Sequence, residues 1–456
     1  MSLDSTGSTG ISLLAEWATN TPLDDIPAAI QRRALMVLLD DAASAVAAYS
    51  EPEIARLTNR LPGGKPEASV LTRPGLKLER SQAAMLNAIA ANWCQLDEGH
   101  RKVMCHAGLY VVPPAIAEAE AENLSFGEVI RAIVLAYEVV CRFAETWTFP
   151  GNAVHPHAIW SPLGAATALG LLRRLSAADL MAAMTTALTF GQPGPFRHGI
   201  QGALVQNVWA GTGVLSGFRT LDFVAAGITG LTTSPHDVLS GLLGATAEHD
   251  RITHELGSSW ALTSSYHKLH SCAQQSHAAV EAAIKLKEEW PAVQNIADVS
   301  RIVVNVHPLA LKMDNPKPAN TLSARFSIPH IVATALMFGR ASADVFTLDI
   351  LNDHDLAILR ERVELALFEP RLAWPQDRAA SITVEFLDGH KLFGECLSAE
   401  GGPDRPYSEA QIIRKCVSLM VMLYPGFPSD AEALNLASLD YAQDFPSFLG
   451  SLLSIR

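Results

Sequence analysis

The segment PLGAATALGLL (residues 162–172) is apolar on nearly every face and rich in alanine and glycine. A helix without a polar face belongs in the interior of a protein, and small side chains let neighbouring helices approach it closely. The segment therefore predicts the central helix of a large helical domain.

Helical patterns flank this segment throughout the N-terminal part of the chain. Residues 26–50 repeat apolar side chains at helical spacing. Ser125 is followed three residues later by Glu128, which is the pattern of a capping box ahead of the apolar run VIRAIVLAYEVVCRF. Ser176 and Asp179 form a looser version of the same signal ahead of a further helix.

A different pattern appears in the last third of the chain. The segments VSRIVVNVHP (299–308) and ASITVEFLDGHKLFGECLS (380–398) predict strands, the second one folded into a hairpin at Asp-Gly. Between them, residues 326–339 and 353–367 have a helical period, and helical patterning returns over 407–423.

We therefore predict a multidomain α and α+β protein. Its large all-α domain is formed by residues 1–271 and 399–456, and a smaller α+β domain of residues 272–398 is inserted between them. The first residues, about 1–10, are polar and Gly/Ser-rich, and we expect them to be disordered.

The composition disfavours several classes of function. The formal net charge is −13 and lysine and arginine form no run, so no nucleic-acid surface is expected. No apolar stretch reaches the roughly 18 residues of a membrane span, and the polar N-terminus lacks a signal-peptide pattern. The six cysteines form no CxxC pair, which is typical of reduced thiols in a cytoplasmic protein.

Two segments before the central helix carry candidate acid–base groups. CQLDEGHRKVMCHAG (94–108) places four titratable residues within about ten positions: Asp97, Glu98, His100 and His106. They form either an acid–base cluster on a loop held by helices or a solvated polar loop. GNAVHPHAIWSPLG (151–164) adds His155 and His157 at the entry to the central helix, where histidines are either structural or close to an anionic ligand.

The segment YHKLHSCAQQSH (266–277) allows three interpretations. A zinc site is disfavoured because its histidines and Cys272 match none of the usual chelating spacings. A Cys–His nucleophile would need a third group to orient the base, which the sequence does not reveal. Lys268 lies near the predicted domain boundary, where it either binds a carboxylate and moves a proton or extends from a surface helix.

The segment GQPGPFRHGIQGALVQNVWAG (191–211) is rich in glycine and proline. It contains neither GxxxxGK[ST] nor GxGxxG, so a nucleotide site is not expected.

In this order, the segments resemble the MmgE/PrpD family, which includes 2-methylcitrate dehydratase, cis-aconitate decarboxylase and iminodisuccinate epimerase. LDEGHR resembles the family's Asp-Asp-(Thr/Gly)-His segment, and VHPHAIWSPLGAATALG resembles its Phe-His-Pro…Phe-Gly-Ala-Ala stretch. YHKLHSCAQQSHAAVEAA is similar to Tyr-Lys-x-Tyr-x-x-Cys…Thr-His-x-x-Ile-x-Ala, and SARFSIPHIVATALMFG to Glu-Ala-Lys-Phe-Ser-Leu-Pro-Tyr. The resemblance covers nearly the whole chain, and it is specific because several weak motifs occur in the family's order.

The resemblance implies a large all-α domain carrying an α+β lid, a homodimer, no metal and no cofactor. It also implies a site between the two domains, at which a small carboxylate substrate binds and loses a proton next to a carboxylate. The catalytic roles fall on Asp97, His106, His155 and Lys268. His270 and His100 are expected to contact the substrate, and His277 to hold the start of its helix.

The sequence departs from the family pattern at two places. Gln95 stands where the family has an acidic residue, and Gln206, Asn207 and Trp209 stand where it has Lys-Arg-x-His. We hypothesise that Gln95 and Gln206 replace opposite charges that faced each other or a shared substrate group, because losing one charge makes its buried partner costly. A substrate with one fewer carboxylate or a different leaving group would follow.

We therefore expect a cofactor-independent enzyme that abstracts a proton α to a carboxylate of a small polycarboxylate or hydroxy acid. Elimination of water, the reaction of a dehydratase-type lyase, is the first expectation. Epimerisation of a dicarboxylic or amino acid through the same carbanion is the alternative. A homologue that binds carboxylates without catalysis is a third hypothesis.

Overall fold

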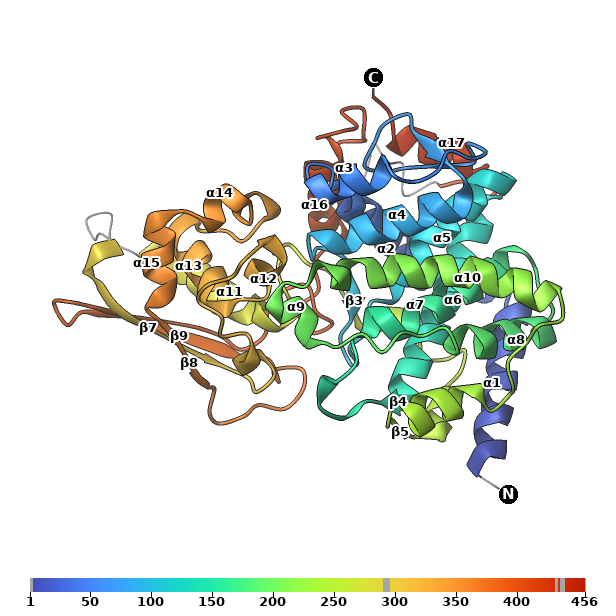
Figure 1. Ribbon diagram of the computed structural model, residues 1–456, viewed down its shortest axis with the longest axis horizontal. Helices are drawn as coiled ribbons and strands as arrows, with labels where there is room; N and C mark the ends of the chain where they lie inside the picture. Colours follow the sequence, from blue (N-terminus) through green and yellow to red (C-terminus); the bar gives the residue numbers. More distant parts are fainter. Residues whose placement is uncertain (1–2, 290–295, 431–433, 435–438, 456) are drawn as a thin grey trace.

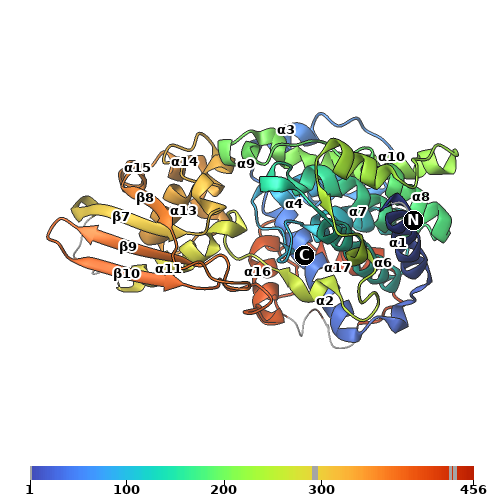
Figure 2. The ribbon, with the colours of Figure 1, turned by 90° about the horizontal axis from the view of Figure 1, so that it is seen from below.

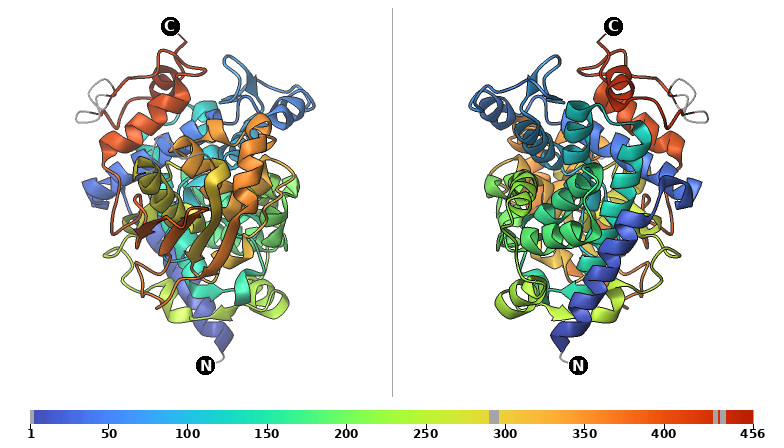
Figure 3. Two further views of the ribbon diagram at one scale, coloured as in Figure 1. Left: turned by 90° about the vertical axis from the view of Figure 1, so that its left-hand side faces the viewer. Right: turned by 90° about the vertical axis from the view of Figure 1, so that its right-hand side faces the viewer.

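The computed structural model describes residues 3–289, 296–430, 434 and 439–455. The chain forms two lobes that lie side by side (Figure 1). The large lobe is helical and contains both ends of the chain, and the small lobe contains a four-stranded sheet and a core cluster whose buried members run from Cys272 to Cys396. The exact domain bounds expected from the sequence stay a prediction. The two termini lie at opposite ends of the large lobe (Figure 3).

Helix α7 (Pro156–Leu172) lies at the centre of the large lobe, as the sequence predicts. All 17 of its residues are buried. A Cβ at Gly217 would lie 2.4 Å from the Cβ of Ala165, so the close approach of the neighbouring helix to α7 requires glycine. The helices that contact α7 are α5 (Ala107–Glu122), α6 (Phe126–Thr146), α8 (Ala177–Leu188) and α10 (Trp209–Ala225).

The remaining large-lobe helices lie around this centre, and two helices that contact α7 begin at caps that the sequence predicts. The capping box of Ser125 and Glu128 is present at the start of α6, and the Ser176 side chain caps α8. The other helices are α1 (Leu3–Asn20), α2 (Ala28–Val46), α3 (Pro52–Thr58), α4 (Arg80–Trp93), α9 (Arg197–Gln201), α16 (Glu409–Met420) and α17 (Phe445–Leu452). Short antiparallel ladders join β1 (Ala68–Ser69) to β2 (Lys77–Leu78), β3 (Gly99–His100) to β6 (Ser265–Tyr266), and β4 (Trp147–Thr148) to β5 (Thr246–Ala247).

The small lobe has its own hydrophobic core between its sheet and its helices. The strand order is β10-β9-β7-β8, and the predicted hairpin is formed by β9 (Ala380–Phe386) and β10 (Lys391–Cys396). Strand β7 (Val299–Val306) is antiparallel to β9 and parallel to β8 (Val363–Leu367). The helices are α11 (His277–Glu289), α12 (Thr321–Arg325), α13 (Ile328–Phe338), α14 (Leu348–Leu351) and α15 (His354–Glu361), and Figure 2 shows several of them beside the sheet.

Two expectations from the sequence differ from the structure. Residues 1–2 lie outside the described residues, but helix α1 begins at Leu3, where disorder was expected. Residues 353–367 form α15 followed by strand β8 rather than one helix. The run VELAL fits a strand as well as a helix, because its valine and leucines recur at every second position as well as four residues apart.

Two further observations concern membrane-spanning helices and the cysteines. Among the described residues, no helix combines the length and the apolar character needed to span a bilayer. All six cysteines are free thiols and are buried, as the absence of CxxC pairs led us to expect.

Candidate active site between the lobes

A hollow of about 470 Å³, including its opening to solvent, lies where the two lobes meet. The large lobe contributes Gln95, His100, His106, His155, His157 and Lys268 to its lining. The small lobe contributes Gln274, Phe326 and Arg378.

Asp97 is the centre of this cluster. Its Oδ2 is 2.6 Å from His106 Nδ1, and its Oδ1 is 3.4 Å from Lys268 Nζ. Burial alone would raise the pKa of Asp97, but Lys268 and His106 outweigh it and lower the pKa to about 2. Asp97 is therefore an ionised carboxylate that joins an imidazole to an ammonium group.

A two-residue ladder brings these groups together from distant parts of the chain. Asp97 lies two residues before the start of β3, and β3 pairs with β6 in the register Gly99 with Tyr266. Lys268 follows β6 by two residues, so the ladder sets it beside Asp97. A Cβ at Gly99 would lie 2.5 Å from the Tyr266 hydroxyl, so glycine is needed for this approach.

His106 is held by helix α5, whose N-cap residue it is. Asp97 contacts its Nδ1, and its Nε2 lies 3.4 Å from the Tyr266 hydroxyl, on the side of the hollow. A carboxylate on one ring nitrogen orients the imidazole and leaves the other nitrogen for a ligand.

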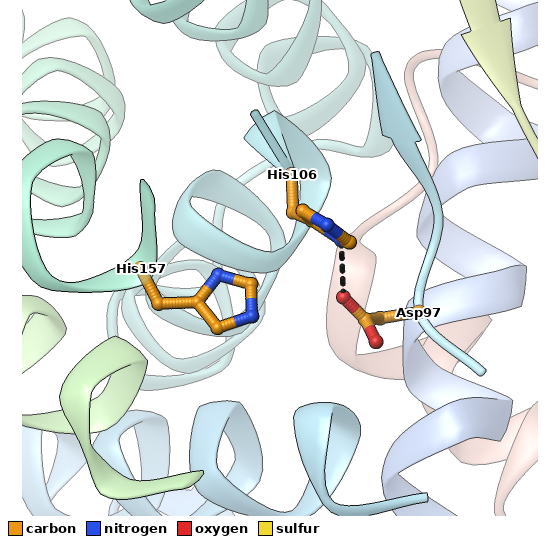
Figure 4. Close-up of side chains that lie close together, drawn as sticks. All are labelled: Asp97, His106 and His157. Carbon is orange, nitrogen blue, oxygen red and sulfur yellow. Dashed lines mark hydrogen bonds and ion pairs between the residues drawn. The ribbon is translucent and has the colours of Figure 1, made fainter. Parts of the chain in front are cut away.

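His155 and His157 come from the first turn of α7, close to His106. His155 is the N-cap residue, and the ring centroids of His157 and His106 are 4.8 Å apart (Figure 4). Both nitrogens of His157 have partners, the Tyr110 hydroxyl at 2.9 Å and Asn92 Oδ1 at 3.0 Å. Burial, followed by repulsion from neighbouring histidines, lowers the pKa of His155 to about 3 and that of His157 well below its usual value. Both rings are therefore neutral near pH 7.

Gln95 contacts the other residues of the site through both its backbone and its side chain. It has φ +54°, a left-handed conformation that is uncommon outside glycine, and its carbonyl oxygen lies 3.2 Å from Lys268 Nζ. Its side-chain amide donates to Asn92 Oδ1 at 2.9 Å. Asn92 in turn lies 3.5 Å from Asn207 Oδ1, so neutral amides link the two places where the sequence departs from the family pattern.

Gln206 is fully buried at the edge of the same cluster. Its Nε2 is 3.4 Å from His155 Nε2, and its Oε1 has no hydrogen-bond partner in the described part of the chain. It does not line the hollow, although it contacts a residue that does. The paired loss of charge at Gln95 and Gln206 stays a hypothesis.

The other residues that were expected to contact the substrate or to hold a helix start occupy different places relative to the hollow. His100 lines the hollow, and burial, followed by Lys102, lowers its pKa to about 3. His270 packs edge-on against His277 at 5.1 Å and is not among the lining residues. His277 starts α11, and its Nε2 lies 3.3 Å from the Cys272 carbonyl oxygen, in keeping with the expected role at the helix start.

Among the described residues, one group of side chains at the site could serve as metal ligands. Single donor atoms of Asp97, His106 and His157 lie within 4.8 Å of one another. The ammonium of Lys268 is next to Asp97, however, and both nitrogens of His157 already have partners. This donor set fits a hydrogen-bond network better than a zinc site, whose ligands have no competing cation. The four residues weighed for zinc in the sequence are not grouped as ligands, since His267 instead pairs with Asp40 at 2.7 Å.

Sequence reasoning missed several lining residues, among them Tyr266, Gln274 and Arg378. Tyr266 opens the segment that drew attention to Lys268, but no pattern singled it out. Gln274 and Arg378 reach the site from the small lobe, and only the packing of the two lobes reveals them.

Comparison with known proteins supports the resemblance. The MmgE/PrpD N-terminal domain matches residues 12–255, and the MmgE/PrpD C-terminal domain matches residues 270–438. A cis-aconitate decarboxylase of Aspergillus terreus is 23% identical over 455 residues, covering 91% of this chain and 90% of the relative. A cis-aconitate decarboxylase-like protein of Aspergillus oryzae is 24% identical over 432 residues, covering 88% of each chain. The 2-methylcitrate dehydratase of Salmonella typhimurium is 34% identical over 130 residues, which are 27% of each chain. With two family domains that together span most of its length, the chain belongs to the MmgE/PrpD family.

Proposed function

We propose that this protein is a lyase that removes a proton from the carbon next to a carboxylate of a small polycarboxylate or hydroxy acid, using its own side chains without a cofactor. The relatives whose names describe lyase reactions support the reaction class. The observation that carries the chemistry is the buried Asp97, which bridges His106 and Lys268, two residues that line a hollow between the lobes.

In this proposal His106 is the base. Asp97 orients its ring and favours the imidazolium that forms when Nε2 takes the proton. The negative charge that develops on the substrate carboxylate is stabilised by Lys268, because a buried ammonium interacts strongly with a nearby anion. The neutral rings of His155 and His157 serve as hydrogen-bonding partners on the same wall.

Elimination of a β-hydroxyl is the favoured outcome. The carbanion expels the hydroxyl, which leaves as water after taking a proton from a neighbouring donor such as the Tyr266 hydroxyl, 3.4 Å from His106. Burial raises the pKa of Tyr266 well above its usual value, so the hydroxyl carries its proton throughout the neutral range. Reprotonation on the opposite face would give epimerisation instead and needs a second acid there.

Exchange in deuterated water tests the proposal. The enzyme is incubated with citrate, malate, tartrate and methylcitrate, and products are followed by proton NMR. We expect deuterium at the carbon next to a carboxylate together with an unsaturated product. Exchange with inversion and no unsaturated product would support the epimerase, and carboxylate binding without exchange or product would support the non-catalytic homologue.

Two variants connect this reaction to the site. Lys268→Gln and His106→Gln are expected to lower kcat/KM by at least about a hundredfold, the usual scale for a general acid or base or for the stabilisation of a developing anion. Lys317→Gln is the control, because Lys317 has a side chain 76% exposed and pairs with Glu361 far from the hollow. Full activity of a folded Lys268→Gln protein would contradict the proposal. The homodimer implied by the family resemblance stays a prediction, and light scattering in solution tests it.

A further inference from the structure

The two cationic side chains that line the hollow differ in how closely a carboxylate lies to each of them. Lys268 and Arg378 are its cationic lining residues, and no aspartate or glutamate is among the residues described as lining it. Lys268 is already paired with Asp97 at 3.4 Å. Arg378 comes from the small lobe, and the ion pair that the described residues give it is a longer one, with its neighbour Asp377 at 3.9 Å.

The surroundings of Arg378 compensate its charge only weakly. Its neighbour Asp377 lies 3.9 Å from Arg378 Nε, but the carboxylate of Asp377 accepts a hydrogen bond of 2.6 Å from Arg101 of the large lobe. The Arg378 guanidinium donates to the neutral side chain of Gln274. Burial, followed by repulsion from Arg101, lowers the pKa of Arg378 to about 10, so its cationic form is disfavoured where it stands. An anion bound there would relieve this cost.

Arg378 also has a defined position along the site. A neighbouring hollow shares Val103, Met104, Pro156 and Arg378 with the first one. Lys268 and Asp97, by contrast, are buried with side chains no more than 1% exposed. The Arg378 side chain is 14% exposed, so it stands nearer to solvent than Lys268 does.

We propose that Arg378 binds a second carboxylate of the substrate, so that the site selects acids with two carboxylates over acids with one, and that the Arg101–Asp377 pair between the lobes is the positioning contact that holds it there. This inference rests on the proposed function only in taking the inner carboxylate to bind at Lys268. An arginine suits this task because its planar guanidinium holds a carboxylate through two parallel hydrogen bonds. Because Arg378 belongs to the small lobe, the selection depends on contact between the lobes.

The test is a pair of ligands that differ by one charge. Binding of succinate and of monomethyl succinate is measured by calorimetry on the wild type and on Arg378→Gln and Arg378→Lys. We expect the wild type to bind succinate at least tenfold more tightly, and Arg378→Gln to bring the ratio close to one by weakening succinate alone. Arg378→Lys should keep part of the preference. An unchanged ratio in Arg378→Gln, or no preference in the wild type, would overturn the inference.

Matched variants separate this role from a structural one. Arg371 lies on the same connection between β8 and β9 with a side chain 64% exposed, so Arg371→Gln should keep the full ratio. Arg101→Gln should lower the ratio part of the way while monomethyl succinate binds as before, and equal weakening of both ligands would show that the lobe contact only supports the fold. Circular dichroism confirms that each variant is folded.

The calorimetry needs no turnover, so the two proposals can fail separately. A wild type that shows the succinate preference but no deuterium exchange keeps the Arg378 inference and loses the lyase. If deuterium exchange depends on Lys268 but Arg378→Gln leaves the ligand ratio unchanged, the lyase proposal is kept and the Arg378 inference is lost.

Discussion

Asp40, Asp41, Asp97 and Glu98 are buried beside the candidate site and occur in the sequence as two pairs of neighbours. The first member of each pair contacts a lysine and a histidine, which lower its pKa against the effect of burial. The second member has no such cation, and burial raises the pKa of both Asp41 and Glu98 well above the usual value. Adjacent carboxyl groups are thus divided into a charged set and a set that favours the protonated form.

Glu98, one of the two carboxyl groups whose pKa is raised, contacts the helix that carries His106. Its Oε1 accepts a hydrogen bond of 2.6 Å from the Gly108 amide, in the first turn of α5, and its Oε2 accepts one of 3.0 Å from Tyr137. His106 immediately precedes this turn. The carboxyl group therefore fixes the helix start that holds the proposed base.

At the residue scale we predict that Gly108→Ala is destabilising. The added Cβ would lie 2.4 Å from Asp41 Oδ2 and 2.6 Å from Glu98 Oε1. Overpacking of this kind lowers the free energy of unfolding by about 1–3 kcal/mol. Gly450→Ala is the matched control in helix α17, because its Cβ would meet nothing within 4 Å and alanine favours the helix by up to about 1 kcal/mol. Denaturation in urea compares the two, and equal stability of both variants would contradict the packing argument.

At the scale of elements, caps define the helices that carry the core. Helix α6 begins with a reciprocal pair, in which Ser125 Oγ accepts from the Glu128 amide at 3.2 Å and the Glu128 side chain accepts from the Ser125 amide at 2.9 Å. Both signals are local, so the sequence reveals them without the fold. Helix α1 shows the opposite case, because its Gly/Ser-rich start carries no helix signal.

We predict that Ser125→Ala lowers the free energy of unfolding by about 1 kcal/mol, since the N-cap and one arm of the capping box are lost. Ser176→Ala at the start of α8 should have an effect of similar size. Ser258 is exposed and its hydroxyl contacts only the Glu255 carbonyl oxygen among the described residues, so Ser258→Ala should change stability by less than about 0.5 kcal/mol. Thermal or urea unfolding ranks the three, and a Ser125→Ala variant as stable as Ser258→Ala would argue against the box.

At the scale of the whole molecule, both lobes bury histidines as neutral rings. Burial is the first cause in every case, and it lowers the pKa to about 3 for His100, His155 and His330 and to about 4 for His270 and His307. An unfolded histidine takes up a proton near pH 6.5. Between that pH and the folded pKa, the unfolded chain binds more protons than the folded protein, so stability falls as pH falls.

We therefore predict that the free energy of unfolding decreases from pH 6.5 toward pH 4, each such histidine contributing up to about 1.4 kcal/mol per pH unit. His330 lies in the small lobe away from the site, so His330→Gln should flatten this decrease even if it lowers stability at pH 7. His254 has a side chain 74% exposed, and His254→Gln should leave the pH dependence unchanged. Urea midpoints at pH 7.0, 6.0 and 5.0 measure the slopes, and identical slopes for wild type and His330→Gln would refute the assignment.

Some interpretations from the sequence failed because tertiary contacts decide them. A Cβ at Gly10 in α1 would lie 2.4 Å from Ile252 Cγ2, so its small residues permit close packing against the rest of the large lobe and the segment is helical despite its weak propensity. Residues 363–367 pair in parallel with β7, and that partner lies about sixty residues away. In both cases the distant partner cannot be identified from the periodicity of the segment itself.

The sequence by itself determined the helical centre at 162–172, the helix caps, the hairpin at 380–398 and the candidates Asp97, His106, His155 and Lys268. These follow from periodicity, capping and short motifs, all of which act over a few neighbouring residues. Only the tertiary structure decided that Lys268 lies beside Asp97, that His270 packs against His277 and is not among the lining residues, and that Arg378 enters from the other lobe. The first and the last of these bring together residues more than a hundred positions apart in the chain. The ladder between β3 and β6 sets Lys268 beside Asp97 within the large lobe, and the packing of the two lobes brings Arg378 to the hollow.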